Sequence, residues 1–301
     1  MDQAENLRIL VRMQKDEQNL PAQKGKILGS TRIIAITSGK GGVGKTNITL
    51  NMALALAKEN HKKVLVLDAD FGTANIDIVM GIIPKYNISH MLYEDKTLEE
   101  VILNGPHGIK ILPGVSGLAS LTALTEVQKE KFFAQLEDYN KKYHLDYILI
   151  DTGAGLGTNV INFLLAADEI IVIVTPEPTS LSDAYAIIKV VNQYDPDMKV
   201  NIITNMVNGQ IEADKVFNTI NSVSEKFLDK TINYLGFIKY DKCMPSAVKQ
   251  QKPLMLSYPN SETSLEILKL SNVIMNKPYN KKQTILSFFE LAGKYFGWNN
   301  D

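Results

Sequence analysis

Eight consecutive residues near the start of this chain have the types and the spacing of a loop that binds phosphate. The run reads GKGGVGKT and fits the pattern G-x-x-x-x-G-K-[ST], in which backbone N–H groups surround phosphate oxygens. In such a loop Lys45 supplies a positive charge to the β- and γ-phosphates, and the Thr46 hydroxyl ligates Mg²⁺. The sequence therefore predicts a site for a nucleoside triphosphate and Mg²⁺ at Gly39, Lys40, Gly41, Gly42, Val43, Gly44, Lys45, Thr46 and Asn47.

Lys40 is a second lysine that a loop of this kind does not need. It stands at the start of the loop, so we expect it to point away from the following helix and to serve a second nucleotide across a dimer interface. A glycine-rich turn with exposed lysines is the alternative interpretation of the run. The nucleotide site is favoured because an apolar, β-rich run, Arg32–Ser38, precedes the loop and a helical pattern, Thr46–Lys58, follows it.

Carboxylates follow two other apolar runs, where a phosphate loop needs them. Asp151 follows Tyr147–Ile150, and a carboxylate at that place holds Mg²⁺ directly or through water. Asp68 and Asp70 follow Val64–Leu67, and hydrolysis needs a carboxylate that orients water behind the γ-phosphate. A cap after a strand and a turn with two solvated acids are the alternatives. Together with the loop, the pattern favours Asp151 as a metal ligand and Asp68 and Asp70 as catalytic residues.

Apolar runs of strand length alternate with helical patterns along the body of the chain, which is typical of an α/β protein. Several runs consist almost wholly of Val, Ile and Leu, as in parallel strands buried on both faces. We predict one domain, residues 32–277, with a doubly wound, mostly parallel sheet and helices on both faces. The predicted strands are Arg32–Ser38, Val64–Leu67, Ile109–Leu112, Tyr147–Ile150, Glu169–Val174, Val200–Thr204 and Tyr234–Ile238, and the predicted helices include Glu126–Tyr143, Ser182–Gln193 and Ala213–Leu228.

The composition argues against several classes of protein. Among 301 residues, 32 basic and 33 acidic side chains nearly balance, which argues against a strongly basic nucleic-acid-binding protein. Cys243 is the only cysteine, so there is no internal disulfide and no Cys-x-x-Cys site for a metal or Fe–S cluster. The polar N-terminus does not resemble a signal peptide, and no apolar run approaches the ~18 residues that cross a bilayer. We expect a cytoplasmic protein.

These motifs together resemble those of the deviant Walker A ATPases of the MinD/ParA group, over about residues 32–275. The similar residues are the loop with its extra Lys40, the run DADFG at 68–72, the run DTGAG at 151–155 and the block TPEPTSLSDAY at 175–185. The resemblance implies a P-loop NTPase fold, ATP and Mg²⁺ as ligands, and a homodimer in which Lys40 contacts the other subunit's phosphates. It also implies that Asp70 orients the attacking water and that Asp68 assists.

The resemblance places recognition of the base at Asn205, which follows the apolar run Val200–Thr204. An Asn side chain offers both a donor and an acceptor to the edge of adenine. We expect the region after Ile238 to pack on the other side of the base. A turn residue at the end of a strand is the alternative interpretation of Asn205.

Residues 1–13 have the spacing of a short amphipathic helix, and residues 14–31 read as a linker. The run DQAENLR at 2–8 matches the Asp-Gln-Ala-x-x-Leu-Arg motif of the FlhG proteins, also called YlxH, which are flagellar relatives of MinD. The resemblance implies that this helix engages the GTPase FlhF and stimulates its GTP hydrolysis. A frayed terminus is the alternative. The expected partner-binding residues are Asp2, Gln3, Ala4, Leu7 and Arg8.

Residues 278–301 read as a polar linker and a last helix, Thr284–Trp298, with an apolar stripe along one side. The stripe fits either an ordinary helix packed on the domain or a helix in a membrane interface. In MinD and FlhG proteins an equivalent helix targets the membrane, so the resemblance implies a peripheral membrane contact of the ATP-bound dimer. The expected membrane-binding residues are Ile285, Phe288, Phe289, Ala292, Tyr295 and Phe296.

We therefore expect an ATPase of the FlhG type that regulates flagellar number and placement and is reset by ATP hydrolysis. Components of the flagellar basal body are further candidate partners, and no specific nucleic acid is expected. A ParA-type ATPase that binds DNA non-specifically is the main alternative, but it needs a basic surface that the charge balance does not support. An Fe–S scaffold of the same superfamily and an adaptor that acts only through its N-terminal helix are the others.

Overall fold

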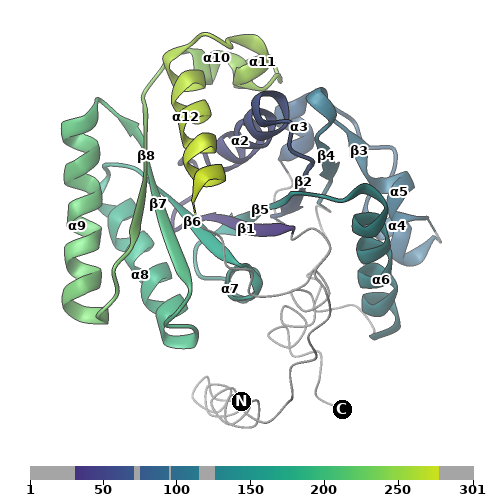
Figure 1. Cartoon of the computed structure of the whole chain (residues 1–301), viewed down its shortest axis with the longest axis horizontal. Coiled ribbons are helices and arrows are strands. Elements are labelled where there is room, and N and C mark those ends of the chain that lie inside the picture. The colour runs from purple at the N-terminus through teal and green to yellow at the C-terminus, as the bar shows by residue number, and fades with distance from the viewer. Residues whose placement is uncertain (1–30, 71–74, 95, 115–125, 278–301) are drawn as a thin grey trace.

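Runs of β-branched residues form the strands at the centre of the molecule. The strands β1, RIIAITS, and β6, EIIVIV, are buried along their whole length, which explains why neither alternates between apolar and polar side chains. The computed structural model describes residues 31–70, 75–94, 96–114 and 126–277 (Figure 1). Its strands are β1 (Arg32–Ser38), β2 (Val64–Ala69), β3 (Leu103–Asn104), β4 (Lys110–Leu112), β5 (Tyr147–Ala154), β6 (Glu169–Val174), β7 (Lys199–Val207) and β8 (Asn233–Lys239).

These strands form one sheet in the order β3-β4-β2-β5-β1-β6-β7-β8. All neighbouring pairs are parallel except β3 and β4, which confirms the prediction of a doubly wound, mostly parallel sheet. The strand β1 lies between β5 and β6, so the chain fills one half of the sheet first and the other half later. In doubly wound sheets, ligands bind at the carboxyl ends of the strands where this order reverses. The loop that follows β1 is therefore at the expected place for a ligand.

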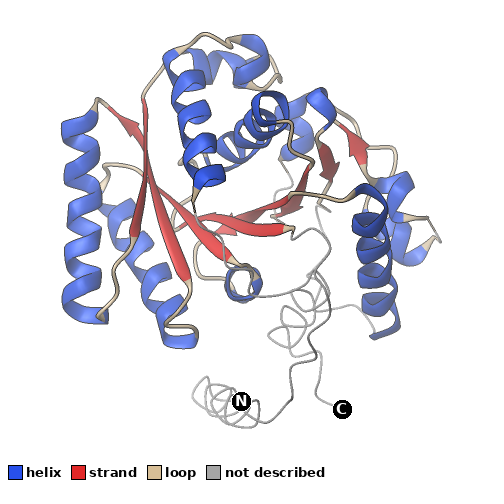
Figure 2. Ribbon diagram, in the orientation of Figure 1, coloured by secondary structure: helices blue, strands red, loops and turns tan. Residues whose placement is uncertain are grey.

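Helices cover both faces of the sheet, as Figure 2 shows. One core packs the sheet against α4 to α9, and the other packs it against α2, α3 and α10 to α12. The helices are α2 (Lys45–Asn60), α3 (Ile76–Met80), α4 (Ile88–Tyr93), α5 (Leu98–Val101), α6 (Glu126–Tyr143), α7 (Thr158–Ala166), α8 (Pro178–Tyr194), α9 (Gln210–Leu228), α10 (Cys243–Lys249), α11 (Leu254–Ser257) and α12 (Glu262–Asn276).

The predicted strands and helices agree with the structure to within four residues at each end. The strand β3 and the helices α3, α4, α5, α10 and α11 were not expected from the sequence. Each has seven residues or fewer, so none spans enough turns or alternations to show a hydrophobic period. The helices α7 and α12 were not predicted either, and the run VINFLLA of α7 is apolar on nearly every side.

The helix that follows the phosphate loop is held from several sides. The apolar side chains of Ile48, Met52, Ala55 and Leu56 on α2 are all buried. Their neighbours from Thr49 to Ala57 are buried as well, because α2 lies between the sheet and the helices α11 and α12. A helix enclosed in this way fixes the direction of its own N-terminus, where Lys45 and Thr46 stand.

Several predictions concern residues that the structure does not describe. The N-terminal helix, most of the linker at 14–31, the C-terminal helix and the residues Phe71 and Gly72 lie outside the described residues. Among the helices that are described, none is long and apolar enough to cross a membrane.

Candidate functional site

Parallel strands bring the residues predicted to do chemistry to one edge of the sheet. The phosphate loop follows β1, Asp151 stands near the carboxyl end of β5, and Asp68 stands near that of β2. Because β5 lies between β1 and β2, Asp151 pairs in register with both Ile36 and Asp68. Residues separated by more than a hundred positions in the chain therefore become neighbours.

Close packing explains why two positions of the loop carry glycine. A Cβ atom added at Gly39 would lie 2.3 Å from the Cβ of Asp183, so the start of the loop rests directly on α8. Gly44 has a φ of +88°, a conformation that side chains other than glycine rarely adopt. Any larger residue at either position would displace the loop from the sheet or from α8.

Lys45 forms a buried ion pair with Asp151. Its Nζ lies 2.8 Å from Asp151 Oδ1, and the two side chains are 8% and 1% exposed. Burial raises the pKa of the Asp151 carboxyl group, and the charge of Lys45 opposes that shift. The side chain of Thr46 also lowers the pKa of Asp151, and the Thr49 hydroxyl lies 3.4 Å from the same Oδ1. Lys45, Thr46 and Asp151 thus form one connected polar cluster.

The donor atoms of this cluster suit Mg²⁺. A hydroxyl and a carboxylate are oxygen ligands of the kind that Mg²⁺ takes from proteins beside substrate phosphates. Within the described ranges, no group of three or more His, Cys, Asp or Glu side chains could hold a metal ion alone. The hydroxyl of Thr46 and the carboxylate of Asp151 therefore fit a Mg²⁺ ion that is also bound by the phosphates of a nucleotide.

The Asp68 carboxylate is occupied by backbone groups. It accepts hydrogen bonds from the N–H of Asp70 at 3.1 Å, of Asn75 at 3.1 Å and of Ile76 at 3.2 Å. It therefore ties the end of β2 to the start of α3. Burial, followed by the charge of Asp151, raises the pKa of Asp68 to about 7, although the three N–H groups act in the opposite direction.

Asp70 is half-buried, whereas Asp68 is only 1% exposed. A Cβ added at Gly153 would lie 3.7 Å from Asp70 Oδ1, so this carboxylate sits over the residues that follow Asp151. Its negative charge contributes to the raised pKa of Asp151. Of the two carboxylates after β2, Asp70 is thus the better placed to face a ligand, and Asp68 holds the backbone.

The raised pKa of Asp68 predicts a pH-dependent stability of the free protein. The folded chain binds this proton more tightly than the unfolded chain, whose group titrates near 3.8. The free energy of unfolding should therefore fall as the pH rises from about 4 to about 7, by up to about 1.4 kcal/mol per pH unit from this group. The substitution Asp68→Asn should remove that contribution. Urea unfolding of both proteins at pH 5 and pH 7.5 measures the difference.

The control for this comparison is Asp138→Asn, which replaces an exposed carboxylate on α6. If the difference in unfolding free energy between Asp68→Asn and the unchanged protein stays the same at both pH values, Asp68 does not titrate in this range.

Lys40 points away from the buried cluster. Its Nζ bonds to the Glu177 carboxylate just before α8, and the two side chains are 43% and 59% exposed. An ion pair as exposed as this contributes at most about 1 kcal/mol, so Lys40 can exchange its partner at little cost. Glu177 belongs to the TPEPTS block, to which sequence reasoning gave no role. The signal that could have found it is a carboxylate three residues after the end of the buried strand β6, immediately before α8.

Asn205 lies at the end of β7 and contacts the phosphate loop itself. Its Nδ2 donates a hydrogen bond to the Val43 carbonyl at 2.7 Å, and the residue is buried. Sequence reasoning expected this side chain beside a base and did not foresee the contact with the loop. Thr49 was missed as well, although its position four residues after Lys45 puts it on the same side of α2.

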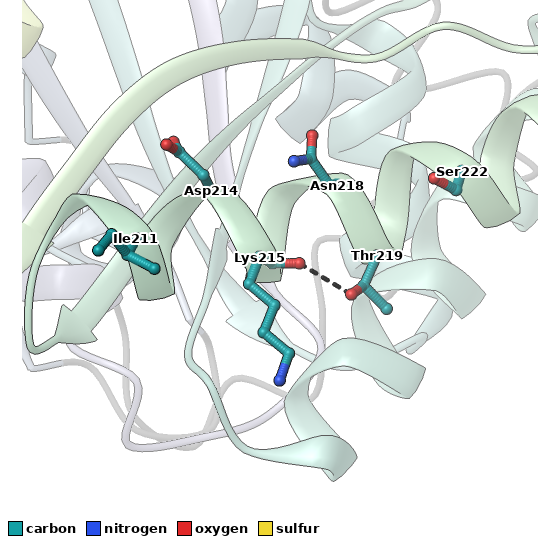
Figure 3. A pocket seen from close by; sticks show the side chains of 6 residues that line it. All are labelled: Ile211, Asp214, Lys215, Asn218, Thr219 and Ser222. Atoms are coloured by element: carbon teal, nitrogen blue, oxygen red, sulfur yellow. Dashed lines mark hydrogen bonds between the residues drawn. The ribbon is translucent and has the colours of Figure 1, made fainter.

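A shallow hollow along α9 lies apart from this site (Figure 3). Every residue that lines it belongs to that one helix, and the Thr219 hydroxyl donates to the Lys215 carbonyl beside it at 2.8 Å. The hollow follows one exposed stripe of a helix at the edge of the molecule (Figure 1), and it contains none of the residues predicted to bind a nucleotide.

Comparisons with known proteins find relatives of this chain. The family model described as an AAA domain matches residues 31–204. The chain is 38% identical over 234 residues to the antiactivator FleN of Pseudomonas aeruginosa, covering 78% of this chain and 82% of FleN. It is 35% identical over 275 residues to the flagellum site-determining protein YlxH of Helicobacter pylori, covering 89% of this chain and 92% of that protein.

Solved structures show the same fold. The septum site-determining protein MinD of Pyrococcus horikoshii, complexed with Mg-ADP, superposes with a TM-score of 0.65 at 26% identity, covering 82% of this chain and 97% of that one. A chain of the MinC:MinD cell division protein complex of Aquifex aeolicus also gives a TM-score of 0.65 at 26% identity, covering 84% of this chain and 99% of that one.

Proposed function

Because this chain belongs to the MinD/ParA family of ATPases, we propose that it is a flagellar member whose ATP-bound homodimer regulates flagellar number and placement. The observation that carries the proposal is the arrangement at the carboxyl edge of the sheet. There, the buried cluster of Lys45, Thr46 and Asp151 lies beside the exposed Lys40. The similarity to FleN and YlxH, named as an antiactivator and a site-determining protein, supports the flagellar role.

We assign the buried cluster to the phosphates and the metal. The N–H groups of the loop and the N-terminus of α2 bind the phosphate oxygens, and Lys45 exchanges Asp151 for the β- and γ-phosphates. Thr46 and Asp151 would hold Mg²⁺, which supplies neutralisation of the charge that develops on the phosphates. The complex of a MinD relative with Mg-ADP supports this choice of ligands.

We assign the two carboxylates after β2 to different tasks. Asp70, the more accessible of the two, orients the water that attacks the γ-phosphate. Asp68 holds the N–H groups of Asp70, Asn75 and Ile76 and so fixes the backbone that carries Asp70. In this arrangement Asp68 positions the backbone around Asp70, and Asp70 contacts the attacking water.

Dimer formation depends on Lys40 in this proposal. The lysine is exposed, lies at the start of the loop and pairs with Glu177 on the same surface. When a second subunit approaches, the negative charge of its bound ATP competes with Glu177 for the ammonium group. Because the exposed ion pair is weak, the triphosphate can displace Glu177 from Lys40.

The two terminal segments, which lie outside the described residues, connect the ATPase cycle to its partners. Residues 1–13 are proposed to engage FlhF and to stimulate its GTP hydrolysis. The helix at 284–298 is proposed to bind the cytoplasmic face of the membrane. One such helix, whose expected membrane-binding residues include four aromatic side chains, is a marginal anchor, and two copies in a dimer bind far more strongly. ATP would thus control membrane binding by controlling dimerisation.

Two truncations test these assignments, and each serves as the control for the other. Removal of residues 284–301 should abolish ATP-dependent sedimentation with liposomes and leave stimulation of an FlhF-type GTPase intact. Removal of residues 1–13 should abolish that stimulation and leave sedimentation intact. Sedimentation should require ATP and be lost with ADP, because only the dimer presents two helices. Liposome binding that is the same with ATP and ADP, or that persists after removal of residues 284–301, would contradict the membrane switch.

A further inference from the structure

Asn205 contacts the part of the phosphate loop that must be held in shape. Its Nδ2 donates to the Val43 carbonyl at 2.7 Å, and the residue is only 6% exposed. A Cβ added at Gly44 would lie 2.8 Å from the same Nδ2, so the amide packs directly on the tightest turn of the loop. The bond joins residues 162 positions apart and attaches the end of β7 to the loop after β1.

An irregularity in β7 accompanies this contact. Asn205 pairs with Ile238 of β8, but the next pair joins Val207 to Lys239, so Met206 is an extra residue in β7. Met206 has a φ of +58°, which is uncommon for a residue with a side chain. Bulges of this kind re-aim neighbouring side chains beside active sites. Packing of Met206 does not account for the strained backbone, because its side chain remains 40% exposed.

We propose that Asn205 is a positioning residue for the phosphate loop. By holding the Val43 carbonyl, it keeps the following N–H groups directed toward the phosphates, whether or not a base is bound. An amide has two N–H donors and one carbonyl acceptor, so one N–H and Oδ1 remain for the base. Asn205 therefore links recognition of the base to the shape of the loop. The inference rests on the proposed nucleotide site and assigns this residue a task that a base-reading residue alone would not have.

Tripolyphosphate, which carries no base, separates the two tasks. We expect Asn205→Ala to weaken binding of Mg-tripolyphosphate about tenfold in isothermal titration calorimetry, because the Val43 carbonyl loses its buried donor. Binding of ATP should weaken at least as much. Asn205→Asp keeps the size of the side chain but removes its N–H donor. This variant should therefore weaken binding of tripolyphosphate to a similar or greater extent. If both variants bind tripolyphosphate as the unchanged protein does, Asn205 does not position the loop.

Asn208→Ala is the matched control. Asn208 lies three residues further along, is exposed, and bonds to Glu212 at 2.9 Å instead of to the loop. Its substitution should leave both affinities unchanged. Thermal unfolding of each free variant separates a positioning role from a structural one. A residue that serves only the fold would lower the unfolding midpoint and leave the tripolyphosphate affinity of the folded protein unchanged.

A pair of substitutions at Met206 tests the same inference with Asn205 in place. Met206→Gly tolerates a positive φ and should keep the affinity for tripolyphosphate, whereas Met206→Val strains the bulge and should lower it. Equal affinities of the two variants would overturn the link between the bulge and the loop. If the unchanged protein bound neither ATP nor tripolyphosphate, the proposed function would fail first, which distinguishes the two failures.

Discussion

Replacement of Lys45 by alanine is expected to reduce ATP hydrolysis by at least about a hundredfold. Its ammonium group is the charge that the loop directs toward the β- and γ-phosphates, and removing one such electrostatic contact typically lowers the rate by 10²–10³. The buried ion pair with Asp151, at 2.8 Å, already holds Lys45 beside the residue expected to hold Mg²⁺. Steady-state release of phosphate measures the rate, and calorimetry with ATP measures the affinity.

The same substitution also leaves the buried Asp151 carboxylate without its cation. Asp151 is 1% exposed, so a bare charge there is costly and the group should hold its proton more strongly. For this reason the thermal midpoint of the free variant must be compared with that of Lys58→Ala. Lys58 is an exposed lysine near the end of the same helix, paired with Glu59. Hydrolysis by a folded Lys45→Ala protein above a tenth of the original rate would refute the assignment.

Replacement of Lys40 by alanine should separate binding of ATP from its hydrolysis. The side chain is 43% exposed and bonds to Glu177, away from the cluster around Asp151. We therefore expect the affinity of a single subunit for ATP to change by less than about threefold, since the lost contact is exposed. Dimerisation with ATP should be lost and hydrolysis should fall about a hundredfold, because the second subunit no longer supplies its lysine to the phosphates. Light scattering after gel filtration with ATP measures the dimer.

Two further variants complete this experiment. Lys189→Ala removes an exposed lysine from α8 and should change neither dimerisation nor hydrolysis. Glu177→Ala leaves Lys40 in place but removes its partner in the single subunit, so the dimer should form at an equal or lower concentration of ATP. If Lys40→Ala still formed dimers and hydrolysed ATP at the original rate, the role of Lys40 across the subunit interface would be wrong.

The fold could be predicted largely from local patterns. β1 and β6 are buried on both faces, and a strand in that environment is apolar at most positions, which makes it visible in the sequence. Long helices such as α6 also showed their bounds, because eighteen residues span several turns of the hydrophobic period. The short helices and β3 span too few residues to show such a period.

The loop at 39–46 illustrates what the sequence determines by itself about chemistry. Glycine is needed there because backbone must approach other backbone closely, at Gly39 against α8 and at Gly44 with its positive φ. Lysine and threonine follow at fixed spacing because the first turn of α2 places them. Since all these requirements are local, a run of eight residues carries them and predicts the phosphate site without the fold.

The partners of these residues were decided only by the tertiary structure. Lys45 meets Asp151 across 106 positions, Lys40 meets Glu177 across 137, and Asn205 meets Val43 across 162. Each contact depends on which strands lie side by side, and on a bulge at Met206 that no local pattern indicates. A sequence motif specifies the groups that a short stretch of backbone can present. The order of the strands in the sheet determines which distant groups they meet, because that order arises from burial of the whole sheet between two layers of helices.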